Sequence, residues 1–154
     1  MEIFTDGNLL ARILLTLVTV GYALVTVLAD INKTHATNPA WTPHARFHVV
    51  WQVASYAGFG VLALVLIWAP GPHASARLYL AAAFAVIIYV AFFLALFTMR
   101  LYGGSTFDSN GYPPLPVRLG QRHRLMDLNV TVFSGFTVTL LATVLVLSRA
   151  ALAG

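Results

Sequence analysis

Long hydrophobic runs separated by short polar segments dominate this sequence. The four longest stretches without Lys, Arg, Asp or Glu are Ile13–Ala29, Phe47–Ala76, Leu78–Met99 and Leu128–Ser148. A helix that crosses a bilayer needs roughly 17–25 mainly apolar residues, so each stretch is long enough to cross once. Allowing for caps and for Pro and Gly breakers, we expect helices at about 8–29, 43–69, 75–102 and 119–149. The pattern predicts an all-α integral membrane four-helix bundle, a single transmembrane domain over residues 1–154.

The composition agrees with a membrane protein and narrows its chemistry. Of the 154 residues, 59% are hydrophobic and 9% are charged, and the mean hydropathy is +0.81, outside the balance of a soluble domain. The chain has no cysteine, which excludes disulfides, thiolate metal sites and cysteine nucleophiles. The pI of about 9.9 comes from a few arginines at helix ends. Membrane topology explains these better than nucleic acid, which we do not expect as a partner.

Basic residues gather at one end of the predicted bundle. Four spans place the first and third connections on the same side of the membrane. That side carries Lys33, Arg46, Arg100, Arg118, Arg122 and Arg124, and the other carries Arg12, Arg77 and Arg149. By the positive-inside rule, both connections are expected in the cytoplasm, and the membrane is expected to be a bacterial inner membrane.

Ionisable and amide side chains concentrate at this same end. They are Asp30, Asn32, His35, Asn38, His44, Arg46, His48, His123, Asp127 and Asn129. Residues three or four positions apart share a helix face, and this spacing predicts three polar stripes. The stripes are Thr19, Tyr22, Thr26 and Asp30; His44, His48, Gln52, Ser55 and Tyr56; and His123, Asp127, Thr131 and Ser134. Because a polar face turned to lipid is unfavourable, we expect all three to point inward around a polar-mouthed cavity.

The pair His44 and His48 is the strongest candidate for chemistry. His-x-x-x-His on a helix allows two imidazoles to reach one metal, and Asp30, His35 or Asp127 would complete such a site. A single imidazole would instead bind haem iron on one side. Two imidazoles on different helices, such as His48 and His123, would bind haem on both sides and give an electron carrier. The residues alone leave these three possibilities open.

Several other polar and aromatic residues have simpler explanations. Ser and Thr in membrane helices often bond to the preceding turn. Trp41, Trp68 and Tyr102 lie near helix ends, as interfacial anchors do. Four phenylalanines, Phe84, Phe92, Phe93 and Phe97, either pack or line an apolar pocket.

The first connection and the start of the second helix read Asp30-x-Asn32-x-Thr34-His35-x-x-Asn38-Pro39-x-Trp41-x-Pro43-His44-Ala45-Arg46-Phe47-His48. This run resembles the signature of a family of small four-helix membrane proteins whose function is uncharacterised. In addition, Ala45-Arg46-Phe47-His48 is similar to the A-R-x-H motif of the styrene oxide isomerase family. Gly104-Ser105-Thr106-Phe107-Asp108-Ser109-Asn110 resembles the G-x-T-F-x-x-N loop of that family.

The resemblance to the isomerases implies haem b with His48 as the axial metal ligand, epoxide opening by Lewis-acid catalysis, and a homo-oligomer, namely a trimer. The chain departs from that family at two positions. The family's active-site Asn falls on Ala54, with Gln52 the nearest amide, and its third-helix Tyr falls near Leu94. We therefore expect haem ligation to carry over and the substrate to differ.

Together, these observations favour a membrane isomerase or lyase that acts on a small lipophilic substrate such as an epoxide, surrounded by membrane lipid. The expected catalytic residues are His44, Gln52, Tyr56 and Asp127, and those expected around the haem are His48, Arg46 and His123. One alternative is a bis-histidine haem electron-transfer protein. The other is a protein that binds or transports lipophilic molecules and carries a non-haem metal site.

Overall fold

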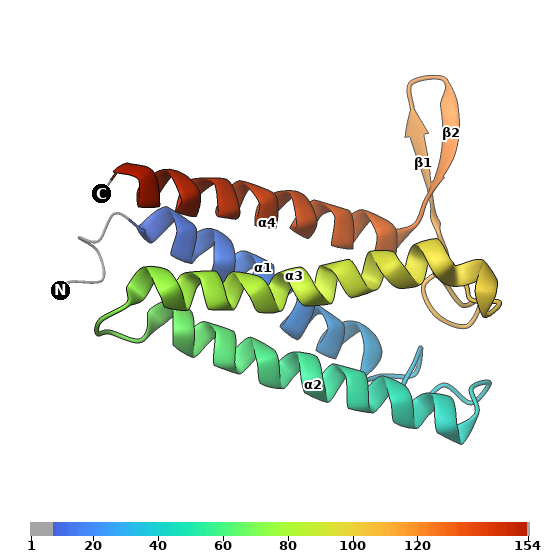
Figure 1. Cartoon of the computed structure of the whole chain (residues 1–154). Coiled ribbons are helices and arrows are strands. Elements are labelled where there is room, and N and C mark those ends of the chain that lie inside the picture. Colours follow the sequence, from blue (N-terminus) through green and yellow to red (C-terminus); the bar gives the residue numbers. More distant parts are fainter. Residues whose placement is uncertain (1–7, 154) are drawn as a thin grey trace.

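The computed structural model describes residues 8–153, which form four long helices and one β-hairpin (Figure 1). The helices are α1 (Leu9–Asp30), α2 (Pro43–Trp68), α3 (Ala74–Thr98), extended by the 3₁₀ turn η2 (Met99–Leu101), and α4 (Leu128–Ala153). The hairpin strands are β1 (Leu115–Leu119) and β2 (Arg122–Met126). All four helices are long and apolar enough to cross a membrane. The predicted all-α membrane bundle is confirmed.

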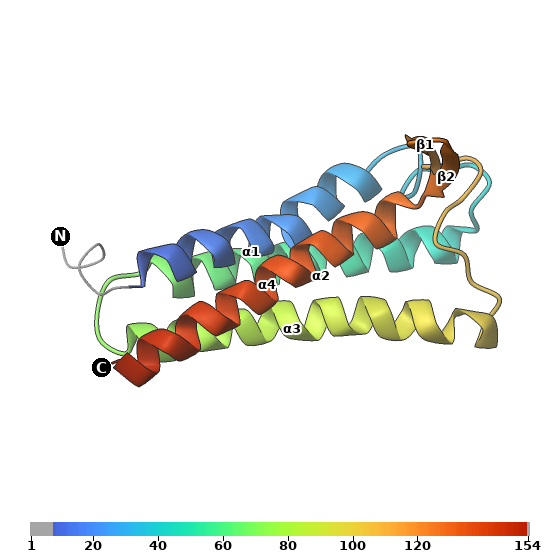
Figure 2. The ribbon, with the colours of Figure 1, turned by 90° about the horizontal axis from the view of Figure 1, so that it is seen from above.

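The two polar connections lie at the same end of the bundle. Figure 2 shows the α1–α2 connection beside the segment that joins α3 to α4, while the start of α1 and the end of α4 lie together at the opposite end. The start of α2 follows from its sequence. The side-chain oxygen of Thr42 accepts a hydrogen bond from the backbone N–H of Ala45 at 3.2 Å, and Pro43 fills the first helical position.

The expected fourth helix over 119–149 is wrong at its start, because α4 begins only at Leu128. Residues 115–126 form an antiparallel hairpin in which Leu119 pairs with Arg122. Gly120 adopts φ +61° in the two-residue turn, a conformation that glycine reaches without strain. Asp127 then caps α4, since its carboxylate accepts a hydrogen bond from the N–H of Val130 at 2.9 Å.

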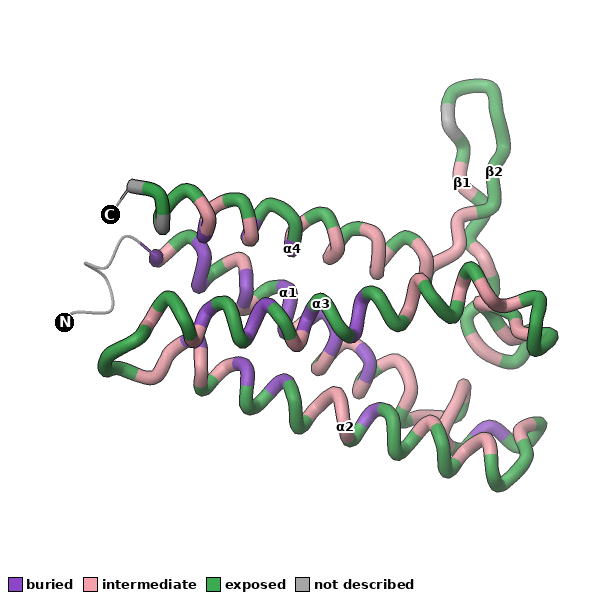
Figure 3. Tube along the Cα trace, in the orientation of Figure 1, coloured by how far each residue is buried: buried purple, intermediate pink, exposed green. Residues whose placement is uncertain are grey.

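The core of the bundle forms along α1. Leu15, Val18 and Tyr22 are fully buried, and the buried positions of α2 and α3 face them (Figure 3). Tyr89 of α3 donates a hydrogen bond from its hydroxyl to the carbonyl oxygen of Val18 at 2.9 Å. The outer faces remain apolar, with Val61 66% exposed. Exposed aliphatic faces of this length suit contact with lipid.

Candidate functional site

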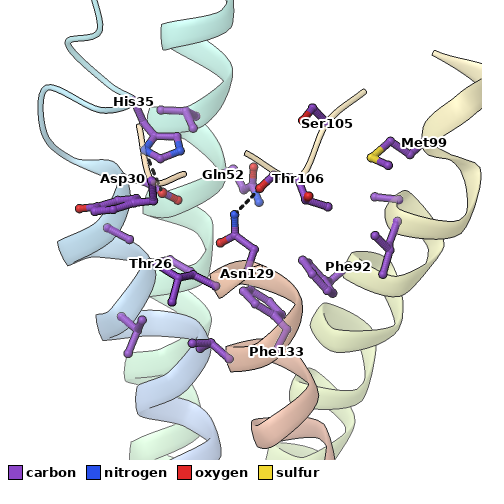
Figure 4. A pocket seen from close by; sticks show the side chains of 18 of the residues that line it. Thr26, Asp30, His35, Gln52, Phe92, Met99, Ser105, Thr106, Asn129 and Phe133 are labelled. Atoms are coloured by element: carbon purple, nitrogen blue, oxygen red, sulfur yellow. Dashed lines mark hydrogen bonds and ion pairs between the residues drawn. The ribbon is translucent and has the colours of Figure 1, made fainter. Parts of the chain in front are cut away.

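A cavity of about 480 Å³ opens at the polar end of the bundle (Figure 4). Its lining comes from all four helices and from both polar connections: Val25, Thr26, Ala29, Asp30, His35, Val49, Gln52, Phe92, Ala95, Leu96, Met99, Tyr102, Ser105, Thr106, Tyr112, Leu128, Asn129, Val132 and Phe133. The volume is in the range of small-molecule sites. The predicted polar-mouthed cavity inside the bundle is therefore present.

The deeper part of the cavity is aromatic. Phe92 of α3 and Phe133 of α4 stack with ring centroids 4.1 Å apart and planes 15° apart. Figure 4 shows both rings below the polar groups of the mouth. Of the four phenylalanines considered from the sequence, Phe92 lines the cavity, whereas Phe97 is 80% exposed. This stacked pair provides an apolar surface for a hydrocarbon group.

Asp30 and His35 form a pair in the wall of the cavity. His35 Nδ1 lies 3.6 Å from the Asp30 carboxylate and 2.7 Å from the hydroxyl of Thr34. The imidazole is also held by rings, since its centroid lies 5.1 Å from that of Trp41 and 6.1 Å from that of Tyr112. An acid and an imidazole are thus fixed beside the pocket, where they can bind a polar group or exchange a proton with it.

Asn32 and Asn38 shape the first connection. The amide of Asn32 donates to the carbonyl oxygens of Leu28 and Ala29, at 2.9 Å each, at the end of α1. Asn38 is fully buried, donates to the carbonyl of Thr34 at 2.9 Å and accepts from the N–H of Ala40 at 3.0 Å. Both amides are used by the loop itself, so they act as turn residues.

The two polar connections are joined by Trp41 and Asp108. The indole N–H of Trp41 donates to Asp108 Oδ2 at 2.7 Å, across 67 residues of sequence. The backbone N–H of Asn110 donates to Asp108 Oδ1 at 2.7 Å. These hydrogen bonds favour the carboxylate and hold the pKa of Asp108 below its usual value of 3.8, with the Asn110 N–H as the largest cause.

We expect Asp108→Asn to lower the thermal stability of the purified protein at pH 7, because the amide is a weaker acceptor than the carboxylate. A lowered folded-state pKa contributes stability above pH 3.8, and that contribution is lost as the pH falls through the folded-state value. The difference in Tm between wild type and Asp108→Asn should therefore shrink below pH 3.8. Ser109→Ala is the matched control. A difference that stays constant down to pH 2 would contradict this role.

The histidine pair lies on the flank of α2. His44 and His48 are both exposed, and their Nε2 atoms are 3.1 Å apart. Residues four positions apart on a helix point in directions that differ by about 40°. The stripe that starts with this pair therefore turns gradually around α2 as it runs toward the middle of the bundle. It reaches the cavity at Gln52 and the bundle interior at Tyr56, whose ring lies 6.4 Å from that of Tyr22. The expectation that both histidines face inward is wrong, because this rotation leaves them on the outside.

Gln52 connects the stripe to the cavity. Its side-chain amide donates to the hydroxyl of Tyr56 at 3.2 Å, and the side chain lies at the cavity wall (Figure 4). Ala54 and Leu94, which match the active-site Asn and Tyr of the isomerases, are both exposed and do not line the cavity. The pocket surface therefore differs from the one that the resemblance implies.

The site residues expected on or beside the fourth helix lie in different parts of the structure. His123 lies on β2, exposed, and the hairpin extends away from α2 (Figure 1). Asp127 caps α4 and also accepts a hydrogen bond from Thr106, so its carboxylate is occupied. Asn129 lines the cavity and donates to the carbonyl of Thr106 at 2.7 Å. Arg46 lies on the first turns of α2, outside the cavity lining.

The stripes predicted from helical spacing did not include the cavity-lining residues of the third connection. Ser105, Thr106 and Tyr112 line the cavity although they belong to a segment without regular structure. The only sequence signal was the run Gly104–Asn110, which resembles the isomerase loop. Within residues 8–153, no three His, Asp or Glu side chains lie close enough to hold one metal ion.

No protein family, curated protein or solved structure matches this chain.

Proposed function

We propose that this protein is a membrane-embedded isomerase or lyase that binds haem through His48 and acts on a small lipophilic substrate such as an epoxide. One observation carries the proposal. The polar stripe of α2 runs from His44 and His48 on the exposed flank to Gln52 at the cavity. A candidate ligand and a largely apolar pocket are therefore one helical turn apart, about 6 Å along the axis.

The surroundings of His48 suit a haem, which needs an imidazole ligand and an apolar surface for its ring. The ring centroids of Phe47 and Trp51 each lie 5.8 Å from that of His48. These two side chains are 62% and 59% exposed. Arg46 adds a cation of the kind that pairs with a propionate. When bound through one histidine, haem iron supplies a Lewis acid that polarises an epoxide oxygen.

In this proposal the residues of the chain bind and orient the substrate. Phe92 and Phe133 contact its hydrocarbon part and exclude water, and the amide of Gln52 donates a hydrogen bond to its oxygen. His44 lies beside His48, with the two Nε2 atoms 3.1 Å apart, so its imidazole adds a polar group next to the proposed ligand. The pair Asp30 and His35 at the mouth is the group that can exchange a proton with the product.

A homo-oligomer belongs to the same proposal. His44, His48, Phe47 and Trp51 together make a face that is polar in part and exposed along α2. In this proposal a second copy of the chain covers this face and a haem on it. The trimer and the cytoplasmic position of the polar connections in a bacterial inner membrane rest on the resemblance and on the positive-inside rule.

The other functions considered from the sequence find less support. Axial ligands on the two sides of one haem lie on opposite faces of its ring, but His44 and His48 are neighbours on one flank and His123 is on the hairpin. A bis-histidine haem within one chain is therefore disfavoured. A protein that binds or transports lipophilic molecules and carries a non-haem metal site would use the same cavity, but no three His, Asp or Glu side chains among residues 8–153 lie close enough to hold its metal.

The test is haem binding together with isomerisation. We expect the protein purified in mild detergent to show a Soret band and to convert a lipophilic epoxide into a carbonyl isomer of equal mass without any reductant. Gln52→Leu should retain the band and lower turnover by about tenfold, the effect of one lost hydrogen bond to a substrate oxygen. No Soret band after haem is supplied would exclude the haem proposal. A band without isomerisation of any epoxide would exclude the enzyme.

A further inference from the structure

The β-hairpin of residues 115–126 extends sideways from the bundle. Figure 1 shows the two strands leaving the start of α4 at a steep angle to the helix axes. In Figures 1 and 2 the hairpin is level with the polar ends of α2 and α3. Met126 is only two residues from Leu128, where the α4 span begins. The hairpin therefore lies beside the bundle, at the depth where the ends of the spans meet the lipid headgroups.

Within the described chain the hairpin is supported mainly by its own pairing. Five residue pairs, from Leu115 with Met126 to Leu119 with Arg122, join the strands. Neither strand packs extensively on a helix. A lone two-stranded hairpin is at best marginally stable in water. A surface outside the chain would therefore stabilise it.

The chemistry of the hairpin indicates what that surface is. It carries Arg118, Arg122, His123 and Arg124 and contains no Asp or Glu. Arg124 pairs with Val117, and Arg118 pairs with His123, so cations occur on both faces. Near the bundle the hairpin is apolar instead, with Leu125 75% exposed and Leu115 43% exposed. Three arginines without an acidic residue on the hairpin suit the phosphate groups found at this depth, and the exposed leucines suit the apolar side of the same interface.

We propose that this hairpin is a docking site for the phosphate headgroups of anionic phospholipids. The arginines bind the headgroup phosphates, and Leu125 and Leu115 enter the interface beside α4. Arg118 also closes the turn, since its Nε donates to the carbonyl oxygen of Gly120 at 3.1 Å. Docking would anchor the start of α4. It would thereby also fix the part of the cavity wall that Asn129 and Phe133 form. This site is independent of haem and of the proposed reaction.

The absence of native cysteine makes a clean reporter possible. Gln121→Cys, at the exposed turn, would be labelled with an environment-sensitive fluorophore in the full-length protein. The labelled protein is then reconstituted into nanodiscs of phosphatidylcholine alone or with 30% phosphatidylglycerol. Both leaflets have the same composition, so the result does not depend on orientation. The readouts are the emission maximum and quenching by iodide.

We expect blue-shifted emission and protection from iodide in the discs that contain phosphatidylglycerol, reversed by high salt. Each arginine near an anionic surface changes such an equilibrium by about fivefold, so Arg122→Gln with Arg124→Gln should weaken docking by roughly 30-fold. Arg122→Lys with Arg124→Lys should retain docking, and Arg149→Gln, at the other end of α4, is the matched control.

Two results would overturn the proposal. One is a reporter signal that is identical with and without phosphatidylglycerol. The other is protection that appears equally in phosphatidylcholine and increases with the number of protein copies per disc, which would assign the hairpin to contact with a second copy. Retention of docking by the lysine pair excludes a folding defect as the cause of loss in the glutamine pair.

Discussion

His48→Ala is expected to lose the Soret band of the purified protein. His48 is the only residue proposed to bind the iron, so its removal leaves no coordinate bond from the chain. The haem content per chain should fall by roughly tenfold or more, and epoxide isomerisation should fall with it. Absorption spectra in the ferric and dithionite-reduced states measure this directly. The reduced spectrum also distinguishes one histidine ligand from two.

The control for this experiment is His73→Ala. His73 lies in the turn before α3, at the opposite end of the bundle, where it adopts φ 61°. It should leave the spectrum unchanged. His44→Ala should retain a shifted or weaker band, because His44 contacts His48 through a ring nitrogen and is not the proposed ligand. Full haem content in His48→Ala would refute the assignment of His48 as the iron ligand. Loss of haem in His44→Ala but not in His48→Ala would identify His44 as the ligand instead.

Gly60→Ala is expected to lower the free energy of unfolding by about 1–3 kcal/mol. A β-carbon at position 60 of α2 would overlap with the β-carbon of Ala23 on α1. Neither atom belongs to a flexible side chain, so the two helices must move apart along their closest contact. The measurement is the midpoint of unfolding in mixed micelles as the fraction of denaturing detergent rises.

Gly58→Ala is the matched control on the same helix. No atom lies within 4 Å of a β-carbon built at Gly58. Alanine is also the better helix former by about 1 kcal/mol, so this change should be neutral or stabilising. Opposite effects at positions 58 and 60 would establish the α1–α2 contact. Equal losses at both positions would contradict it.

The separation of His48 from Asp30 affects how mutants of the cavity are interpreted. Both lie at the polar end, yet His48 is on the outer flank of α2 while Asp30 ends α1 at the cavity wall. A change at Asp30 should therefore alter ligand binding and leave the haem spectrum unchanged. A change at His48 should remove the haem spectrum.

The sequence by itself determined the four spans and the end of the bundle that carries the polar groups. Apolar runs of this length have only one stable arrangement in a bilayer, so composition was sufficient for α1, α2 and α3. The capped start of α2 is a local interaction of Thr42 with Ala45 and was predictable for the same reason. The parity of four spans then brought the two connections together without any knowledge of packing.

Only the tertiary structure decided which polar residues share the site. The flank of α2 that carries His44 and His48 is exposed because α1 and α3 pack on its other faces, and spacing alone does not reveal which face is covered. The bond between Trp41 and Asp108 joins residues that are 67 positions apart. Helical spacing predicted that the fourth helix begins at residue 119, but part of that segment belongs to the hairpin. There, the turn at Gly120 and the pairing between the two strands satisfy the backbone hydrogen bonds that a helix would otherwise make.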